Sequence, residues 1–148
     1  MMEHTYLFKP GCWRAEGFYH MGAERTAPLT GKVTLARDEE HWTLTGFLDA
    51  AFENEPLHAE TAYTISATAN PMELAWTAEN PTLGKLEGAF VVLPGIITSS
   101  YTAPDGVHSG SEMLMQVDEM TYKMQGVLNE HGDPVYWWEG CLTYEPTC

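Results

Sequence analysis

Residues 11–20 read GCWRAEGFYH, a stretch in which two kinds of side chain alternate. Trp13, Ala15, Gly17 and Tyr19 fall on one side of an extended chain, and most of the residues between them are polar or charged. Successive side chains of a β-strand point to opposite faces, so this alternation predicts a strand with one buried face. A glycine beside a large ring on that face lets the strand bend. The stretch therefore predicts a curved strand with an aromatic inner surface.

The same spacing, an aromatic residue followed four positions later by glycine, recurs along the chain. Besides Trp13 and Gly17 it is found at Trp42 and Gly46, Tyr122 and Gly126, and Tyr136 and Gly140. Repeated bends of this kind close a sheet into a barrel. The recurrence predicts curved strands whose aromatic face turns toward the interior.

Glycine or proline interrupts the rest of the chain at short intervals, and the segments between them alternate with the period of a strand. The expected strands cover residues 12–20, 31–37, 42–48, 57–67, 73–78, 86–92, 97–101, 113–117, 122–128 and 136–144. Residues 47–55 also contain an apolar run before Pro56 that is compatible with one or two turns of helix.

Short turns between consecutive strands favour pairing of neighbours, and a sheet of this size closes to remove its edges. We therefore predict an all-β fold, a single up-and-down antiparallel barrel of about ten strands, spanning residues 1–148 as one domain. In such a barrel the first and last strands pair, which would make Cys12 and Cys141 neighbours and candidates for a disulfide. The cysteine usage itself favours a reducing compartment, because three cysteines lack any Cys-x-x-Cys spacing.

The charge balance is strongly acidic, with 21 Asp and Glu against 7 Lys and Arg, and a formal net charge of -14. This charge repels nucleic-acid phosphates and anionic membrane surfaces, so neither is an expected partner. The first ten residues lack the basic and apolar segments of a signal peptide, and no apolar run has the length of a membrane span. The expectation is a soluble, cytoplasmic protein.

Gly11-Cys12-Trp13 at the start of the first strand resembles the Gly-x-Trp signature of lipocalins and other calycins. The longer run from Gly11 to Gly17 is similar to the opening of nitrobindin-like barrels. The resemblance implies a calycin-like barrel, a group that commonly encloses small apolar molecules. Two departures limit it: no arginine follows Lys123 to pack over the tryptophan as in lipocalins, and residues 136–144 lack the late histidine through which nitrobindins hold haem. Haem binding is not implied.

The inner face, by strand parity, collects a set of large side chains that suits either a filled core or a ligand pocket. Its members are Trp13, Tyr19, Trp42, Tyr63, Trp76, Phe90, Tyr101, Met113, Met115, Tyr122, Met124, Tyr136 and Trp138. From them we take as candidate ligand contacts Trp13, Trp42, Tyr63, Trp76, Tyr101, Tyr122 and Trp138. Trp137 must face outward if Trp138 faces inward.

Three charged residues complete the candidate site. Arg14 and Glu16 lie two apart on the face opposite Trp13, where an exposed ion pair is expected. If that polar face instead turned inward, Arg14 would hold a ligand carboxylate, and Glu16 or Glu112 would act as a base. The six histidines are scattered, without metal-ligand spacing, and no serine or cysteine lies in a nucleophile motif. No metal, cofactor or catalytic residue is predicted.

Three functions follow from these observations. The first is a non-enzymatic barrel that binds a small apolar or amphipathic ligand. The second is an enzyme, such as an isomerase, cyclase or hydrolase, that acts on a hydrophobic substrate in the same cavity. The third is a homodimer with a filled barrel that associates through outward aromatic residues such as Phe18, Phe47 and Trp137.

Overall fold

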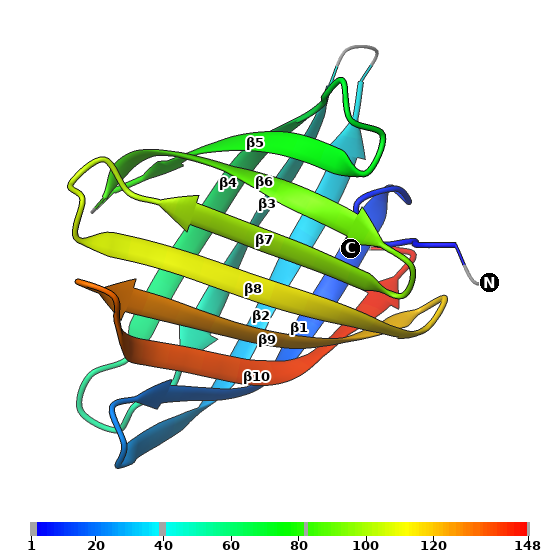
Figure 1. Cartoon of the computed structure of the whole chain (residues 1–148). Helices are drawn as coiled ribbons and strands as arrows, with labels where there is room; N and C mark the ends of the chain where they lie inside the picture. The colour runs from blue at the N-terminus through cyan, green and yellow to red at the C-terminus, as the bar shows by residue number, and fades with distance from the viewer. Residues whose placement is uncertain (1–2, 39–40, 82, 148) are drawn as a thin grey trace.

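Ten antiparallel strands follow one another around a closed barrel in the computed structural model, which describes residues 3–38, 41–81 and 83–147 (Figure 1). Each strand pairs with its neighbours in sequence, and the last pairs with the first. The strands are β1 (Gly11–Met21), β2 (Arg25–Arg37), β3 (Trp42–Ala50), β4 (Leu57–Ala67), β5 (Glu73–Asn80), β6 (Gly84–Leu93), β7 (Ile96–Thr102), β8 (His108–Asp118), β9 (Thr121–Glu130) and β10 (Asp133–Glu145). The predicted all-β, up-and-down barrel is confirmed.

Two glycines that belong to the aromatic–glycine pattern lie where the barrel closes. Gly17 of β1 pairs directly with Gly140 of β10. A Cβ on Gly17 would collide with the backbone at Glu139, and one on Gly140 would collide with the backbone at Glu16. The missing side chains let the two strands approach closely and bend at their crossing, as the recurrence predicted.

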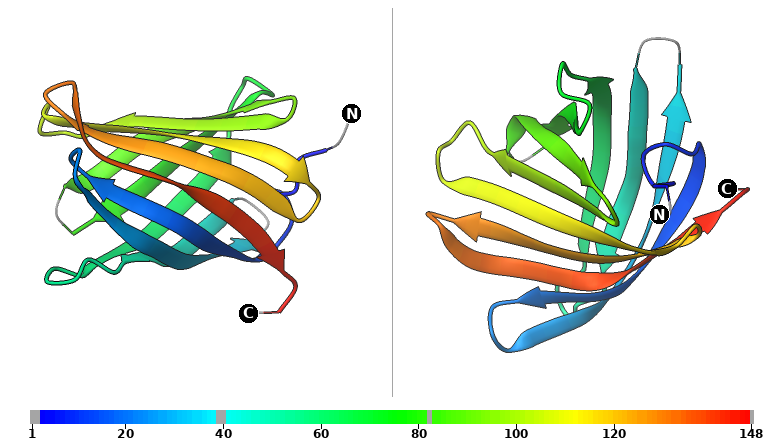
Figure 2. Two further views of the ribbon diagram at one scale, coloured as in Figure 1. Left: turned by 90° about the horizontal axis from the view of Figure 1, so that it is seen from below. Right: turned by 45° about the vertical axis from the view of Figure 1, so that its right-hand side comes forward.

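One end of the barrel is closed by aromatic side chains and by the segment that precedes β1. Trp13 is fully buried there, and the rings of Tyr6, Tyr122 and Tyr144 meet it at centroid distances of 5.3, 5.5 and 5.3 Å in edge-on arrangements. Both chain termini lie at this end (Figure 2). These rings cover the tryptophan that an arginine covers in lipocalins.

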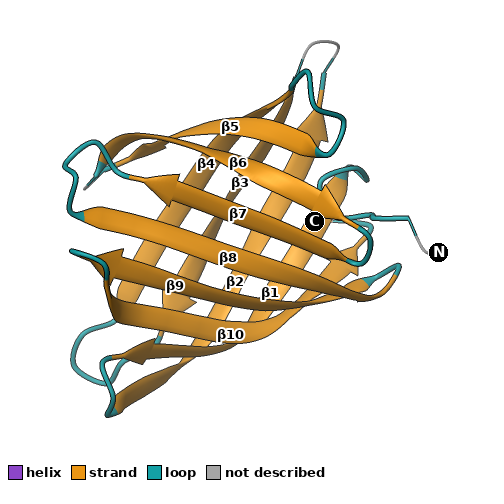
Figure 3. Cartoon of the chain, viewed as in Figure 1, coloured by secondary structure: helices purple, strands orange, loops and turns teal. Residues whose placement is uncertain are grey.

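The tentative helix at residues 47–55 is wrong. The described part of the chain contains no helix (Figure 3). β3 instead continues to Ala50, which pairs with Leu29 of β2. Phe52 packs beyond the end of β3 with Ala50 and Ala27 in a small second core. Ladder hydrogen bonds to β2 and burial of alternate side chains therefore outweigh the local helical pattern.

The predicted parity of β8 is also wrong. Met113 and Met115, expected inside, are 43% and 47% exposed, and the inward residues are Glu112 and Leu114. Pairing with β7 explains the difference, because Leu114 lies opposite the buried Ile97 and Glu112 lies opposite Ser99. The register with the neighbouring strand, rather than the hydrophobicity of each residue, decides which side faces the interior.

The candidate disulfide between Cys12 and Cys141 is wrong, whereas Trp137 faces outward as expected. β1 and β10 pair as predicted, but Cys141 lies opposite Glu16 and is a free, exposed thiol, so it forms no disulfide with Cys12. Cys12 is buried, with its sulfur 3.3 Å from Oγ1 of Thr34. Trp137 does face outward, where it stacks on His20 with a centroid distance of 3.6 Å.

Candidate ligand-binding cavity

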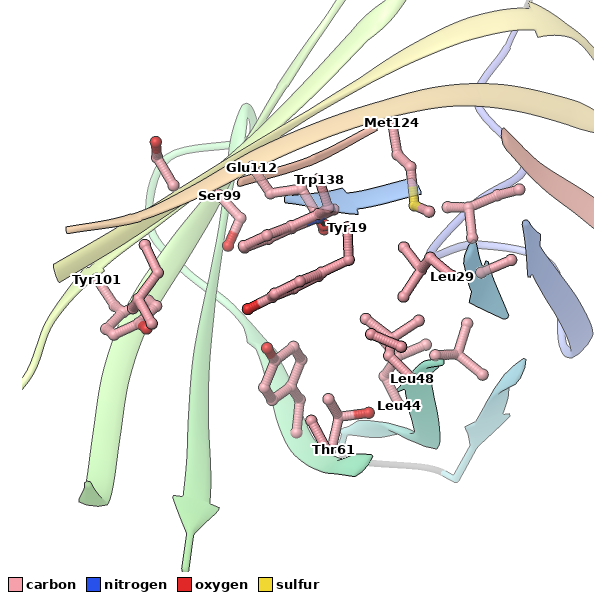
Figure 4. Close-up of a pocket in the computed structure, with 18 of the residues that line it drawn as sticks. Tyr19, Leu29, Leu44, Leu48, Thr61, Ser99, Tyr101, Glu112, Met124 and Trp138 are labelled. Atoms are coloured by element: carbon pink, nitrogen blue, oxygen red, sulfur yellow. Dashed lines mark hydrogen bonds between the residues drawn. The ribbon is translucent and has the colours of Figure 1, made fainter. Parts of the chain in front are cut away.

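The barrel interior holds a cavity of about 350 Å³. It lies between the aromatic rings that surround Trp13 at the closed end and the loops at the opposite end of the barrel. Its wall divides into an aliphatic part, with Leu29, Leu44, Leu48 and Met124, and a polar aromatic part around Glu112 (Figure 4). The volume is within the range of small-molecule sites, at its lower end.

The aliphatic part of the wall follows from alternation along neighbouring strands. Leu29 is an inward residue of β2, Leu44 and Leu48 are inward residues of β3, and Met124 is one of β9. Leu29, Leu44 and Met124 are buried, whereas Leu48 is partly exposed toward the cavity. Apolar contact over this surface favours a hydrocarbon group on any ligand.

Three rings, from β4, β5 and β7, form one aromatic wall. Tyr63 of β4 stacks on Trp76 of β5 at 4.8 Å between centroids, and Tyr101 of β7 meets Trp76 edge-on at 5.9 Å. The indole Nε1 of Trp76 donates a hydrogen bond of 3.2 Å to Oγ of Ser99. This bond satisfies the indole nitrogen and fixes the ring against the cavity.

A second wall is formed by Tyr19 of β1 and Trp138 of β10, whose rings stack in nearly parallel planes at 5.9 Å. Nε1 of Trp138 donates a hydrogen bond of 2.9 Å to Oε2 of Glu112. In Figure 4 these side chains lie together on one side of the cavity, near Ser99.

Glu112 is an inward carboxyl group in surroundings that are mostly apolar and aromatic. Burial raises the pKa of Glu112, and the hydrogen bond from Trp138 offsets part of this shift by stabilising the charged form. Burial, followed by the negative charge of Glu112, also raises the pKa of Tyr63. Burial raises the pKa of Tyr19 to about 12. The tyrosines therefore face the cavity as neutral hydroxyls that can donate or accept hydrogen bonds.

Thr61 adds a further polar atom to the cavity wall. Its Oγ1 is buried and has no hydrogen-bond partner among the described residues. A buried hydroxyl without a partner costs free energy that a ligand group could recover by bonding to it.

The cavity reaches the surface beside the first half of β4. In the described ladders, residues 57–62 pair with β3 but not with β5, whose pairing with β4 begins at Tyr63. Leu57 and Ala59 line the cavity from this half, together with His58, whose side chain is 55% exposed. Because this edge of β4 has no described partner on β5 and its residues line the cavity, we take it as the mouth of the cavity.

Hydrogen bonds hold the side chain of His58 on the outer face of the barrel beside this mouth. Its Nδ1 contacts a carboxylate oxygen of Asp49, its Nε2 lies 3.4 Å from Oε1 of Glu60, and its ring stacks on Phe47 at 5.9 Å. The hydrogen bond with Asp49, followed by that with Glu60, raises the pKa of His58.

The residues proposed from the sequence fall into four places, one of which is the outer surface. The five that line the cavity are Tyr63, Trp76, Tyr101, Glu112 and Trp138. Trp13 and Tyr122 are fully buried in the closed end. Trp42 is partly buried against the core, and the guanidinium of Arg37 lies 5.2 Å from its ring centroid.

Arg14 and Glu16 lie outside the barrel. They form an exposed ion pair at 3.2 Å, and Arg14 also lies 3.2 Å from Glu145. The ion pair expected at the surface is present, and in this structure the side chain of Arg14 does not line the cavity. Of the residues in that alternative, only Glu112 faces inward.

The candidate contacts chosen from the sequence left out Leu29, Leu44 and Leu48 of the aliphatic wall and the polar contributions of Ser99 and Thr61, although Met124 was placed on the inner face. Leu29 was missed because the second strand was expected to start at residue 31, whereas β2 starts at Arg25. Extending the alternation of Val33 and Leu35 backward would have found it. Tyr6 precedes the first strand, and no periodic pattern in the sequence indicates that it enters the barrel.

No three His, Cys, Asp or Glu side chains in residues 3–38, 41–81 and 83–147 are grouped so that they could hold a metal ion. No helix in these ranges is suited to cross a bilayer.

No protein-family model matches the chain, and no curated protein matches its sequence. Among solved structures, the S-type phycobiliprotein lyase CPES from Guillardia theta is similar, with a TM-score of 0.67 at 9% sequence identity over 95% of this chain and 90% of that chain. An N-terminal dehydratase from the difficidin assembly line covers 95% of this chain and 79% of its own at 9% identity, with a TM-score of only 0.28. The ten-stranded barrel and the similarity to the lyase agree with the Gly11-Cys12-Trp13 opening, and the fold is a calycin-like, lipocalin-like barrel.

Proposed function

We propose that the protein binds a small apolar or amphipathic molecule inside the barrel. The observation that carries this proposal is the cavity of about 350 Å³ with an aliphatic wall, two aromatic walls and a few polar atoms. A filled barrel would have used that volume for its own side chains. At the density of protein interiors the space suits a ligand of roughly 15 to 20 non-hydrogen atoms.

The fold supports this proposal without specifying the ligand. The similar structure is called a phycobiliprotein lyase, but 9% identity extends the likeness to the fold alone. We therefore base the proposal on the cavity of this chain and assign no shared reaction.

Fluorescence of the neutral apolar dye N-phenyl-1-naphthylamine tests the proposal. The dye brightens when it leaves water, and its size suits the cavity. We expect saturable one-to-one binding to the unmodified protein. Leu48→Trp, which adds a ring into the cavity, should weaken binding by at least about tenfold through steric exclusion. Leu93→Trp makes the same substitution at an exposed position of β6 and should bind as the unmodified protein does.

Two results would overturn the proposal. One is the absence of saturable binding, and the other is equal affinity in Leu48→Trp and the unmodified protein. Circular dichroism of each variant shows whether the barrel is retained, so that a loss of binding is not confused with unfolding.

A second candidate function is proton-transfer catalysis on an apolar substrate. It is favoured by one observation, the position of Glu112 inside the cavity with a pKa raised by burial. Such a group can act as a general acid or base. The test is incubation of the protein with a small-molecule extract, followed by mass spectrometry. A compound consumed by the unmodified protein and not by Glu112→Gln would support catalysis, whereas identical profiles would exclude a catalytic role of Glu112 on the extracted compounds.

A further inference from the structure

The charge that a side chain can place inside the cavity is negative. Among the described residues that line the cavity, Glu112 is the one with a carboxyl group. His58, at the mouth, is the one that can become cationic. Arg14, the residue expected to receive an anionic group, is on the outer surface. A carboxylate ligand would therefore meet no fixed positive charge in the interior and would face the charge of Glu112.

One oxygen of Glu112 remains open to a ligand. Oε2 accepts the hydrogen bond from Trp138, and no described protein group donates a hydrogen bond to Oε1. A carboxylate with a free oxygen in a largely apolar cavity binds a donor strongly, because hydrogen bonds between charged partners strengthen where water is excluded. Ser99, opposite Glu112 on β7, lies beside it as a hydroxyl.

The aromatic walls favour positive charge as well. The rings of Tyr63, Trp76 and Tyr101 form one part of the cavity wall, and those of Tyr19 and Trp138 form another. The faces of such rings attract cations through their quadrupoles, and the attraction grows when the cation is desolvated. The net charge of -14 adds a long-range attraction that brings cations toward the protein.

We propose that the cavity selects a ligand that carries a protonated nitrogen on a compact hydrocarbon body. The nitrogen would donate to Oε1 of Glu112 between the two aromatic walls, and the hydrocarbon body would lie against Leu29, Leu44 and Leu48. This inference rests on the proposed function, because it names the chemical class that the same cavity prefers.

Three probes of matched shape test the preference: 4-phenylbutylamine, 4-phenylbutan-1-ol and 4-phenylbutyrate. Calorimetric titration at about pH 8 keeps the amine probe cationic and the phenylbutyrate probe anionic. We expect the amine to bind at least about tenfold more tightly than the carboxylate, the scale of one charge-assisted hydrogen bond, with the alcohol between them. This ranking is measured on the unmodified protein and needs no variant.

Glu112→Gln then tests whether Glu112 causes the preference for the amine probe. The amide keeps the volume of the side chain and can still accept from Trp138, but it carries no charge. We expect it to lose most of the advantage of the amine over the alcohol and to retain affinity for the alcohol. Glu16→Gln removes the same charge from the outer surface and should keep the ranking of the unmodified protein.

The outcomes separate the two proposals. If the three probes bind the unmodified protein equally, the ligand cavity stands and the preference for a cation is wrong. An advantage of the amine that survives in Glu112→Gln would also overturn the inference. If none of the probes binds and the neutral dye does not bind either, the proposed function itself fails.

Discussion

The indole of Trp138 on β10 reaches Glu112 on β8 by lying across Gly126 of the strand between them. The three residues are in register, since Glu112 pairs with Gly126 and Gly126 pairs with Trp138. Nε1 of Trp138 donates to Oε2 of Glu112 at 2.9 Å. A Cβ at Gly126 would overlap the six-membered ring of that indole. The hydrogen bond at the cavity wall therefore depends on a missing side chain.

Replacing that glycine should displace the indole. Gly126→Ala places a methyl group where the Trp138 ring lies, and we expect a loss of about 1–3 kcal/mol in the free energy of unfolding through overpacking. Urea unfolding measures this loss, and the indole N–H resonance of Trp138 reports the hydrogen bond. Gln125→Ala, at the next residue with its side chain exposed, should leave both unchanged. An unchanged resonance in Gly126→Ala would contradict the argument.

Removing the donor should raise the pKa of Glu112 further. In Trp138→Phe a ring remains but the N–H is lost, so the charged carboxylate loses the hydrogen bond that offsets its burial. Carbon-13 NMR of the side-chain carboxyl carbons follows this titration directly. The matched control is Trp137→Phe, because Trp137 is adjacent in sequence but stacks on His20 outside the barrel. A pKa of Glu112 that stayed the same or fell in Trp138→Phe would show that the bond does not stabilise the charge.

The raised pKa of Glu112 also predicts how stability changes with pH. A carboxyl group whose pKa is higher in the folded state than in the unfolded state binds more protons when folded, so its effect opposes folding as pH rises. The loss begins near the unfolded value, about 4.3, and is complete above the folded pKa. Within that window it is at most about 1.4 kcal/mol per pH unit.

Glu112→Gln should remove this dependence. The difference in unfolding free energy between the variant and the unmodified protein should therefore increase in favour of the variant as pH rises through the window. Urea unfolding at several pH values measures that difference. The contributions of other titrating groups are the same in both proteins and cancel. One such group is Asp105, whose pKa is lowered to about 2 by hydrogen bonds from His108 and Val107. A difference that stayed constant with pH would argue against a raised pKa.

The sequence was sufficient to predict the barrel because its pattern is local. Alternation within each strand and turns such as Pro104-Asp105-Gly106 depend on residues close together in the chain. The glycines of the repeat were recognised, but the partner of Gly126 was not. Gly126 accommodates Trp138 from the next strand rather than Tyr122 four residues earlier. Gly88, which lies outside the repeat, faces the ring of Trp76 of the neighbouring strand in the same way. Such contacts depend on register across strands.

The candidate site was predictable only where parity held. Tyr63, Trp76 and Trp138 were placed inside by alternation and do line the cavity. For Met113 and Met115 on β8 the predicted face was wrong. Both side chains are apolar, but the register with β7 turns them outward. Whether the interior is filled or hollow depends on the summed volumes of side chains from all strands, and no local pattern contains that information.

The segment before β1 should come loose when its anchor is removed. The hydroxyl oxygen of Tyr122 accepts hydrogen bonds from the backbone N–H groups of Thr5 at 3.1 Å and Tyr6 at 3.4 Å, and it lies 2.7 Å from Nδ1 of His4. Tyr122→Phe leaves these buried groups without their partner, which costs about 1–3 kcal/mol. We expect faster amide hydrogen exchange in residues 3–10. Tyr136→Phe, near the opposite end of β10, should leave exchange in this segment unchanged.

The first half of β4 should be the least protected part of the barrel wall. Residues 57–62 pair with β3, but in the described ladders their other edge has no partner on β5. Backbone amides that point toward that edge are not held by a ladder bond, so local opening there disrupts fewer contacts than elsewhere. The same residues border the mouth of the cavity, which places the most mobile edge where a ligand would enter.

Hydrogen exchange of peptides from β4 measures this difference. We expect residues 57–62 to exchange faster than residues 63–65, which pair with both β3 and β5. Saturating the protein with a bound probe such as N-phenyl-1-naphthylamine should slow exchange in the first group and leave the second unchanged, because a ligand stabilises the closed state of the mouth. Equal exchange in both halves of β4, with or without the dye, would contradict an entrance beside β4. It would favour entry between the loops at the end of the barrel opposite Trp13.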